Sequence, residues 1–411
     1  MKKRIKYFYF FGGSLASPAA YVHFYKGWVD IARKNGLPME LITILPFKTY
    51  ITQRRLVKKY RQISYFRIFC GIHNNFDHLL IFVYFFYIGL LNDKIIIHLN
   101  KRPPYLFDIF KKIFPKKLKY IIELEGDYES EMDYLSKHPY KDGFYANEIN
   151  RTEMVKRQLK KRIKSCDCLF VVTEKFKNLL IERHSDLNLE QKVKVLPISV
   201  DTEEVYFSMK ARGEYRRRLK LEDKFVMIYV GNAYRSWQNV FRTIEILKLI
   251  KNKVAENAFL ILLIRQEDHH IVKEFIEKLN LSKNEYILTQ VDHEEIAKYL
   301  SASDIGILLR HKHLMNEVVT SGKIVEYLAC GLPVLTTNVV AVYPEEISKN
   351  NYGIILNDMD DNNEILTKII PFLKHDKEKR FEICEWARRK FSTDAHSQEY
   401  VNALIGLATE E

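Results

Sequence analysis

One stretch of the sequence carries polar residues in an order that suits a phosphorylated ligand. Residues 304–337 read DIGILLRHKHLMNEVVTSGKIVEYLACGLPVLTT. This pattern predicts a strand that ends at Arg310, a polar loop, and a helix that begins near Ser321 and ends at Cys330. The first turn of such a helix presents backbone N–H groups and the positive end of the helix dipole, which suits a diphosphate.

Two side chains of this helix also suit a phosphorylated ligand. Lys323, directly after Gly322 in the first turn, adds a point charge facing the phosphates. Glu326 lies three residues further on, on the same face of the helix, where its carboxylate can accept both hydroxyls of a ribose. The two positions predict a nucleotide diphosphate site, and an ordinary amphipathic helix with a Glu–Lys pair is the alternative.

The elements that would position these residues alternate between apolar strands and amphipathic helices. Such alternation is typical of βαβ units and therefore of parallel sheets in an α/β fold. The predicted strands are 4–11, 39–45, 94–100, 118–126, 166–175, a short strand before a proline-containing turn within 193–207, 225–232, 258–266, 285–291, 304–310, 333–337 and 352–356. The predicted helices include 18–35, 151–165, 239–253, 270–280, 293–302 and 322–330.

The chain length and the pattern both indicate two domains. A chain of 411 residues is too long for one ordinary core. The series of strands restarts after a charged helix near 209–224, so we predict Rossmann-like domains at 1–208 and 209–391, the first completed by a C-terminal helix at 392–411. Doubly wound sheets bind ligands at the carboxyl ends of their strands, which predicts a cleft between domains that face each other.

The formal net charge of +13 comes from basic runs in the first half of the chain. Such a surface attracts nucleic acid, anionic lipid or phosphorylated substrates, and a solvated basic face is the alternative. The runs comprise Lys48, Arg54, Arg55, Lys58, Lys59, Arg61 and Arg67; Lys111, Lys112, Lys116, Lys117 and Lys119; and Lys156, Arg157, Lys160, Lys161, Arg162 and Lys164.

The first basic run coincides with helical spacing of apolar residues. Within 53–69, Leu56, Tyr60, Ile63 and Phe66 recur at that spacing, with basic residues between them. A basic amphipathic helix can lie on an anionic membrane, so we predict peripheral membrane contact here, with an ordinary surface helix as the alternative.

Two apolar segments resemble membrane signals. The first 20 residues have a basic tip and a short apolar run, but a glycine pair interrupts it, which favours a first buried strand. The uncharged segment 79–91 is too short to span a bilayer and predicts a buried helix. The 5 cysteines are scattered without metal-binding spacing, which predicts buried thiols in a reducing cytoplasm.

The block from Lys323 to Val334, KIVEYLACGLPV, resembles the signature of family 4, or group 1, glycosyltransferases of GT-B fold. Arg310 and Asn316 upstream resemble a subset that acts on bacterial surface polysaccharides. Weaker similarities fall in the family's order: CDCLFVVTEKFKNLL, VKVLPISVDTEEVYF, YVGNAYRSWQNV and VDHEEIAKYLSASDIGILL.

The resemblance implies roles for individual residues. Glu326 would bind the donor ribose, while Lys323, Arg310 and Arg235 would face the pyrophosphate. Asp127, at the end of a strand, would orient the acceptor hydroxyl, and Lys323, Arg235 and Asp127 are the predicted catalytic residues. The further predicted donor-binding residues are Gly12, Gly13, Gly231, Asn316, Ser321 and Gly322.

The sequence departs from the family pattern at four places. Val318 stands where many members have a first glutamate, with Glu317 beside it, and Ser321-Gly322 replaces Ser-Pro. The WQG-like turn ends in Asn239, and PNGVD reads PISVD at 197–201. These changes affect the donor contacts more than the enzyme class.

The resemblance therefore implies a hexosyl- or other glycosyltransferase that uses a nucleotide-diphosphate sugar and a glycan or lipid-linked acceptor, with retention, in surface-polysaccharide synthesis. No metal or other cofactor is expected, and the DxD-like pair Asp358 and Asp360 is interpreted as an acidic loop. The alternatives are a sugar-nucleotide 2-epimerase of the same architecture, a non-catalytic homologue and a nucleic-acid-binding protein. The last lacks any supporting motif, so no nucleic-acid partner is predicted.

Overall fold

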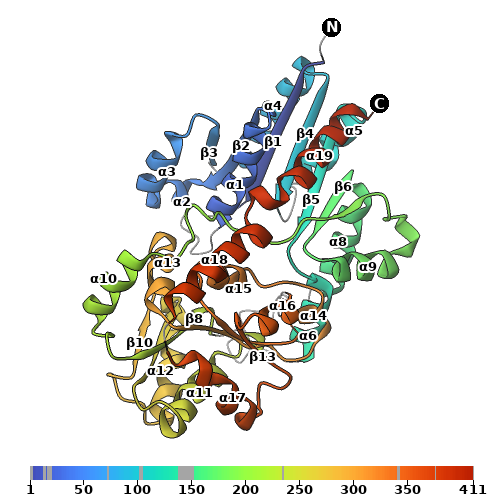
Figure 1. Cartoon of the computed structure of the whole chain (residues 1–411). Coiled ribbons are helices and arrows are strands. Elements are labelled where there is room, and N and C mark those ends of the chain that lie inside the picture. The colour runs from blue at the N-terminus through green and yellow to red at the C-terminus, as the bar shows by residue number, and fades with distance from the viewer. Residues whose placement is uncertain are drawn as a thin grey trace. The chain divides into compact units, whose positions relative to one another are not determined.

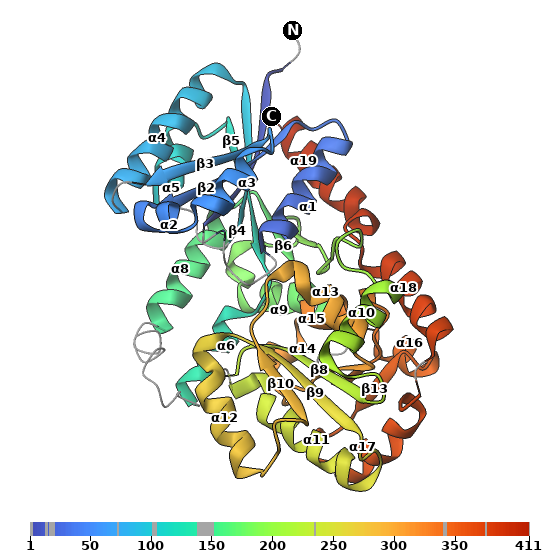
Figure 2. The same ribbon diagram turned by 90° about the vertical axis from the view of Figure 1, so that its left-hand side faces the viewer.

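The computed structural model of the chain describes residues 3–12, 15, 21–71, 74–100, 105–137, 152–233, 236–339, 343–374 and 376–410. The chain divides into two compact units, each built on one parallel sheet (Figures 1 and 2). The first unit comprises Met1–Asp127, Glu153–Pro197 and Thr393–Glu411, and the second comprises Tyr128–Thr152 and Ile198–Ser392. The C-terminal segment thus belongs to the first unit, whereas the segment after Asp127 belongs to the second.

The first unit has a seven-stranded sheet in the order β3-β2-β1-β4-β5-β6-β7. Its strands are β1 (Ile5–Gly12), β2 (Met39–Pro46), β3 (Phe66–Gly71), β4 (Lys94–Asn100), β5 (Leu118–Leu124), β6 (Cys168–Val171) and β7 (Val193–Val195). Its helices are α1 (Tyr21–Lys34), α2 (Phe47–Thr52), α3 (Arg54–Arg61), α4 (Asn74–Leu91), α5 (Tyr105–Ile113), α8 (Thr152–Ser165), α9 (Glu174–Arg183), η1 (Ser185–Leu187), η5 (Asp394–His396) and α19 (Ser397–Thr409).

Alternating side chains of β1 show which helices cover each face of this sheet. Phe8 points toward α4, where its ring lies 5.3 Å from that of Phe85. Its neighbour Tyr9 points the other way and stacks at 5.2 Å on Tyr25 of α1. Tyr400 of α19 packs with α1 on this second face, while α4 and α5 cover the first. Because both faces are covered, β1 is buried almost throughout.

The second unit has a six-stranded sheet in the order β10-β9-β8-β11-β12-β13. Its strands are β8 (Phe225–Gly231), β9 (Ala258–Ile264), β10 (Tyr286–Thr289), β11 (Ile305–Leu308), β12 (Val334–Thr337) and β13 (Gly353–Leu356). Its helices are α6 (Tyr128–Lys137), α10 (Met209–Leu219), η2 (Ser236–Gln238), α11 (Val240–Lys253), η3 (Gln266–Asp268), α12 (His269–Lys278), α13 (His293–Ala302), α14 (Leu314–Glu317), α15 (Gly322–Ala329), α16 (Pro344–Lys349), α17 (Asn362–Ile369), η4 (Ile370–Phe372) and α18 (Lys377–Phe391).

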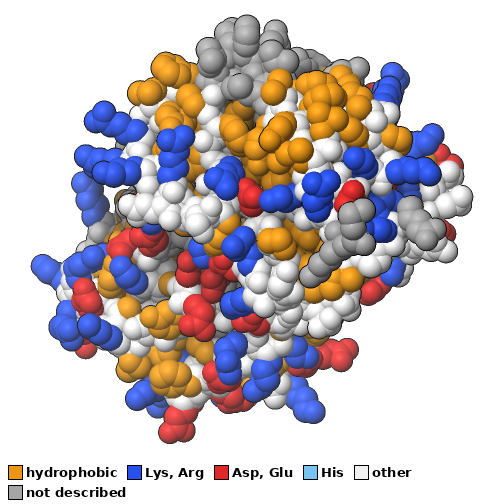
Figure 3. Space-filling model, turned by 90° about the horizontal axis from the view of Figure 1, so that it is seen from above, with side chains coloured by type: hydrophobic (Ala, Val, Ile, Leu, Met, Phe, Trp, Pro, Cys, Tyr) orange, Lys and Arg blue, Asp and Glu red, His pale blue; other side chains and the backbone are white. Residues whose placement is uncertain are grey.

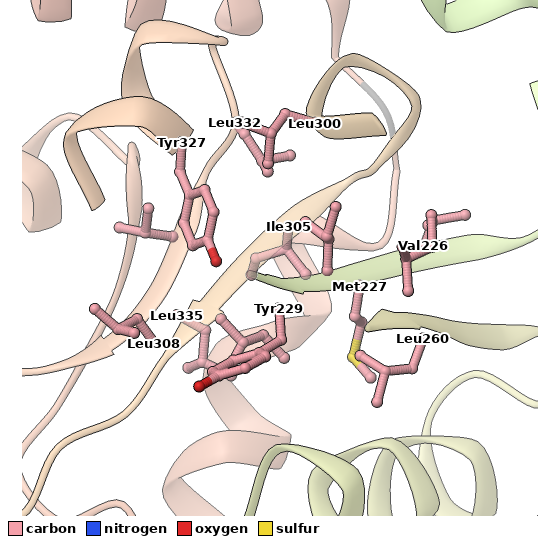
Figure 4. Packing of buried hydrophobic residues seen from close by; sticks show 14 of the residues in the cluster. Val226, Met227, Tyr229, Leu260, Leu300, Ile305, Leu308, Tyr327, Leu332 and Leu335 are labelled. Carbon is pink, nitrogen blue, oxygen red and sulfur yellow. The ribbon is translucent and has the colours of Figure 1, made fainter. Parts of the chain in front are cut away.

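The core of the second unit is built around the central strands β8 and β11 (Figure 4). Tyr327 of α15 and Tyr229 of β8 are both buried among aliphatic side chains. A Cβ atom on Gly306 would lie 2.8 Å from Cγ of the Tyr327 ring, so the absent side chain lets this ring lie flat on β11. The helix that carries the predicted site is thereby held close to the sheet.

The prediction of one amphipathic helix over 53–69 is wrong. The helix α3 ends at Arg61, and the chain enters the edge strand β3 at Phe66. Tyr60 and Phe66 are buried in the core, while Leu56 and Ile63 are half-buried against it. The apolar residues therefore face the protein, and only the basic side chains of α3 are exposed to solvent.

The prediction of a buried helix over 79–91 is wrong for the outer side of α4. Phe85 is buried against the sheet, but Val83, Tyr87 and Leu90 are each more than half exposed. No described helix combines the length and the hydropathy of a membrane-spanning segment. The apolar run near the N-terminus, in contrast, forms the buried inner strand β1, and a buried first strand was predicted there.

The contact between Gly306 and Tyr327 can be tested by adding one methyl group. Gly306→Ala should lower the free energy of unfolding by about 1–3 kcal/mol because the core cannot accommodate the extra volume. Gly213→Ala in α10 of the same unit is the control, since its Cβ would meet only Nη1 of Arg217 at 3.6 Å. Alanine there should be neutral or stabilise the helix by up to about 1 kcal/mol. Guanidinium unfolding followed by tryptophan fluorescence measures both, and equal midpoints would contradict this packing.

Candidate functional site

The helix α15 is fixed to the sheet near its middle and at its C-terminal end. The backbone N–H of Val230 in β8 donates to the Tyr327 hydroxyl at 3.0 Å. At the end of the helix, Gly331 adopts a φ of +61°, and the N–H groups of Gly331 and Leu332 donate to the carbonyls of Leu328 and Tyr327, both at 2.9 Å. This Schellman arrangement needs a left-handed residue after the helix, which explains the glycine.

The N-terminal end of α15 is left without a side-chain cap. Ser321 is the N-cap residue, and its hydroxyl makes no capping hydrogen bond within the described part of the chain. Its carbonyl accepts the N–H of Ile324 at 3.1 Å, which closes the first turn. An uncapped helix start offers backbone N–H groups to an anion.

Lys323 lies against the end of strand β8. A Cβ atom on Gly231 would be 3.1 Å from Cε of Lys323, so a glycine at this position makes room for the lysine. Nζ of Lys323 lies 3.4 Å from Oε1 of Gln238, and that oxygen also accepts from the Tyr229 hydroxyl at 3.3 Å. The predicted site residues Gly231 and Lys323 are therefore adjacent, and Gln238 orients the lysine from η2.

Glu326 is half-buried one turn beyond Lys323. Burial raises the pKa of its carboxyl to about 7, and the nearby Lys323 ammonium opposes this rise. No hydrogen bond to the Glu326 side chain is present among the described residues. A partly desolvated carboxylate in this position is suited to accept hydrogen bonds from the hydroxyls of a ligand.

Arg310 lies in the loop after β11 and is held by Asn316 and Thr337. Its Nη1 donates to Oδ1 of Asn316 at 3.2 Å, and its backbone exchanges hydrogen bonds with the Thr337 hydroxyl. The Asn316 amide also donates to the carbonyl of His311 at 2.9 Å, and the residue is 1% exposed. In this arrangement Asn316 positions the Arg310 guanidinium, and direct contact of Asn316 with a donor stays a prediction.

One departure from the family pattern has a structural explanation, and the residues at two others are neighbours. Asn239 adopts a φ of +48°, a left-handed conformation that asparagine tolerates better than most residues, so it can replace the glycine of the turn. Gly322 and Ile198 stand at two further departures, and a Cβ on Gly322 would lie 3.7 Å from Cγ2 of Ile198. The unusual residues at 198 and 322 are thus neighbours at the start of α15.

An element from the first half of the sequence also borders this region. Tyr134 of α6 makes edge-on ring contacts with Trp237 at 5.9 Å and with His313 at 5.0 Å. Trp237 directly precedes Gln238, and His313 is the N-cap of α14, which carries Asn316. Helix α6 therefore packs on both loops that hold Lys323 and Arg310 in place.

Asp127 lies in the first unit at the end of β5, where it is 1% exposed. Its two carboxylate oxygens accept from Nη1 and Nη2 of Arg183 at 2.7 and 2.9 Å. This two-point ion pair fixes α9 beside β5. An acceptor-orienting role for Asp127 would have to share these oxygens, and it stays a prediction.

The structure says less about the roles of the remaining predicted site residues. Gly12 is the last residue of β1, whereas Gly13 and Arg235 lie outside the described residues. Asp358 accepts the backbone N–H of Asp360 at 3.0 Å, and Asp360 lies 3.5 Å from Nε of Arg242. Within the described residues, no group of His, Cys, Asp and Glu side chains is arranged to hold a metal ion.

Three contributions to the site were not predicted. Tyr229 and Gln238 support Lys323, and Tyr327 fixes the helix that carries both Lys323 and Glu326. Tyr327 stands next to Glu326 in the sequence, and its position on the inner side of the predicted helix was the one signal available. The partner of its hydroxyl lies 97 residues away, which no local pattern indicates.

A known protein family matches the part of the chain that contains the candidate site. Residues 211–390 match the sequence model of a family described as glycosyl transferases group 1. No curated protein matches the chain by sequence.

Solved structures resemble the whole chain at low identity. A glycosyltransferase from Rickettsia africae is 16% identical with a TM-score of 0.67, over 99% of this chain and 100% of that one. HepE from Anabaena, in complex with UDP-glucose, is 13% identical with a TM-score of 0.66, over 97% of this chain and 99% of that one. WaaG, a glycosyltransferase involved in lipopolysaccharide biosynthesis, is 15% identical with a TM-score of 0.58, over 96% of this chain and 95% of that one. The predicted fold, two parallel-sheet α/β domains of GT-B type, is confirmed.

The raised pKa of Glu326 has a consequence for stability. Its carboxyl titrates near pH 7 when folded, against 4.5 as the ordinary value, so the folded state holds the proton more tightly. Stability contributed by the protonated form is therefore lost as pH rises from about 4.5 to about 7. Glu326→Gln removes this loss, so the variant should gain stability relative to the parent across that window. Urea unfolding at several pH values measures the difference, and a constant difference would refute the shift.

Proposed function

We propose that this chain is a glycosyltransferase that moves a sugar from a nucleotide-diphosphate sugar to a glycan or lipid-linked acceptor. The glycosyl transferases group 1 match covers the region in which Lys323 and Glu326 lie. HepE, which has the same fold, was solved with UDP-glucose, and this supports a nucleotide-sugar donor. More specifically, we propose that the transferred sugar is a hexose.

The observation that carries the proposal is the arrangement on α15. An uncapped helix start with Lys323 beside it provides positive charge for a diphosphate, and the partly buried Glu326 follows one turn later for the ribose. The glycine at 231 leaves the room in which the Lys323 side chain lies. A nucleoside diphosphate presents both a diphosphate and the vicinal diol of a ribose, one for each part of this arrangement.

The proposed reaction retains the configuration of the sugar without an enzyme nucleophile. The acceptor then attacks from the side on which the diphosphate departs, so stabilising the departing diphosphate becomes the main catalytic task. Preorganised positive charge performs that task most effectively. We assign it to Lys323, the first-turn N–H groups of α15 and Arg310, with Arg235 as a further phosphate ligand, and this assignment requires no metal ion.

The proposed setting is the synthesis of a cell-surface polysaccharide at the cytoplasmic side of the membrane. The role of WaaG in lipopolysaccharide biosynthesis supports this setting through a shared fold. Peripheral contact with an anionic membrane through 53–69 depends on the exposed basic side chains of that segment, since its apolar residues face the core. Asp127 is the proposed residue on the acceptor side.

A thermal-shift screen of UDP-, ADP- and GDP-sugars tests the donor class. A sugar nucleotide at 100 times its dissociation constant should stabilise the protein by about 2.7 kcal/mol. Release of free nucleotide that requires a glycan acceptor would then separate a transferase from a sugar-nucleotide 2-epimerase. Absence of any shift across the panel would contradict the proposal.

Substitutions on α15 should abolish activity and leave the fold intact. Lys323→Ala and Glu326→Ala each remove a charge-assisted contact of roughly 1.5–3 kcal/mol, so donor affinity should fall at least tenfold and turnover should be lost. The matched controls are Lys349→Ala and Glu345→Ala, an exposed lysine and glutamate on α16 in the same unit. Calorimetric titration with the donor and thermal melting measure both effects. A Lys323 or Glu326 variant that keeps parental activity would remove the site assignment.

A further inference from the structure

The outer side of α4 between Val83 and Leu91 carries a stripe of exposed apolar side chains. Val83, Phe86, Tyr87, Leu90 and Leu91 follow the spacing i, i+3, i+4, i+7 and i+8, which defines one face of a helix. Three of them are 58–59% exposed. A helix on the surface of a soluble protein normally presents polar residues on its outer face, so a stripe of this kind marks an interaction surface.

The neighbouring helix α5 extends the stripe and gives it a basic border. The ring of Phe114, which follows α5, packs at 5.7 Å on that of Phe86, and Ile113 at the end of α5 is exposed. Lys112 and Lys116 are exposed on the same segment, and Nζ of Lys117 donates to the carbonyl of Gly89 at 3.1 Å. Positive charge therefore lies directly beside the C-terminal half of α4.

The opposite border is formed by the edge strand β3. Arg67 lies beside Tyr84 of α4 and pairs with Glu40 at 2.9 Å. Figure 3 shows the face at the top of Figure 1, on which hydrophobic side chains gather with lysines and arginines along the margin. An apolar centre with a basic rim is complementary to a surface that is apolar inside and anionic outside.

We propose that the stripe on α4 binds an anionic lipid bilayer. Val83, Tyr87 and Leu90 would enter the boundary between headgroups and acyl chains, while Lys112 and Lys116 would lie at the headgroup phosphates. Lysine side chains are long enough to keep their ammonium groups in the headgroup layer while their stems cover apolar surface. The inference stands on the first unit alone and does not depend on the proposed transferase activity.

A second copy of the chain is a less suitable occupant. In a two-fold dimer the same surface meets itself, so the two apolar stripes would pack together and bring the two lysine borders toward each other. Like charges brought together at an interface oppose association. An anionic bilayer satisfies the apolar stripe and its basic border at once.

Flotation with vesicles tests the proposal on the full chain. The vesicles consist of phosphatidylcholine alone or with added phosphatidylglycerol, at low salt. The apolar variant is V83Q/Y87Q/L90Q, which keeps good helix formers on the exposed face. The matched control is Y206Q/M209Q/I370Q, three exposed apolar residues of the second unit. The charge variant is K112Q/K116Q.

The parent and the control should bind the anionic vesicles equally, and the apolar variant should bind more than tenfold more weakly. The charge variant should lose about fivefold per lysine on anionic vesicles and nothing on neutral ones. Circular dichroism and thermal melting of the variants should match those of the parent, which shows that the variants fold.

Three results would overturn the proposal. The parent could fail to bind anionic vesicles at low salt, or the apolar variant could bind them as tightly as the parent. In the third result, the parent would sediment as a dimer and the apolar variant as a monomer, and neither protein would float with the vesicles. The stripe would then be an interface between subunits.

Discussion

The hydrogen bond from the Val230 N–H to the Tyr327 hydroxyl, at 3.0 Å, determines where the candidate site can be. The ring of Tyr327 lies on β11 because residue 306 has no side chain, and its hydroxyl reaches the neighbouring strand β8. Both restraints act on the middle of α15. The orientation of the helix therefore follows from the core of the second unit, and the direction of its polar face follows from that orientation.

The polar face combines charges that would be costly without a ligand. Burial raises the pKa of Glu326 to about 7, so the folded protein loses stability when this carboxyl ionises. Structures keep such groups where function requires them. Lys323 lowers this cost, and Gln238 and Tyr229 keep the lysine near the start of the helix. A diphosphate would lie at the helix start beside Lys323, and a ribose would donate hydrogen bonds to the glutamate.

The sequence predicted this region well because its signals are local. The strand before Arg310, the helix start at Ser321 and the glycine after Cys330 all follow from short-range periodicity and turn chemistry. The support from Tyr229, Gln238 and Tyr327 depends on contacts between distant segments, which local patterns do not reveal. The same limit explains the errors in the first unit. Apolar spacing in α3 looks the same whether it faces a core or a membrane, and the composition of α4 cannot show that one of its sides is uncovered.

The central claim is that Glu326 recognises the hydroxyls of a nucleotide ribose while the start of α15 holds the diphosphate. Calorimetric titration of the parent and of Glu326→Ala with UDP, ADP and GDP, and with their 2′,3′-dideoxy counterparts, tests it most directly. For the nucleotide that binds, the parent should prefer the ribose form at least tenfold, since two hydrogen bonds to a charged group are lost in the dideoxy form. The variant should bind both forms equally. A preference of the same size in both proteins would contradict the account.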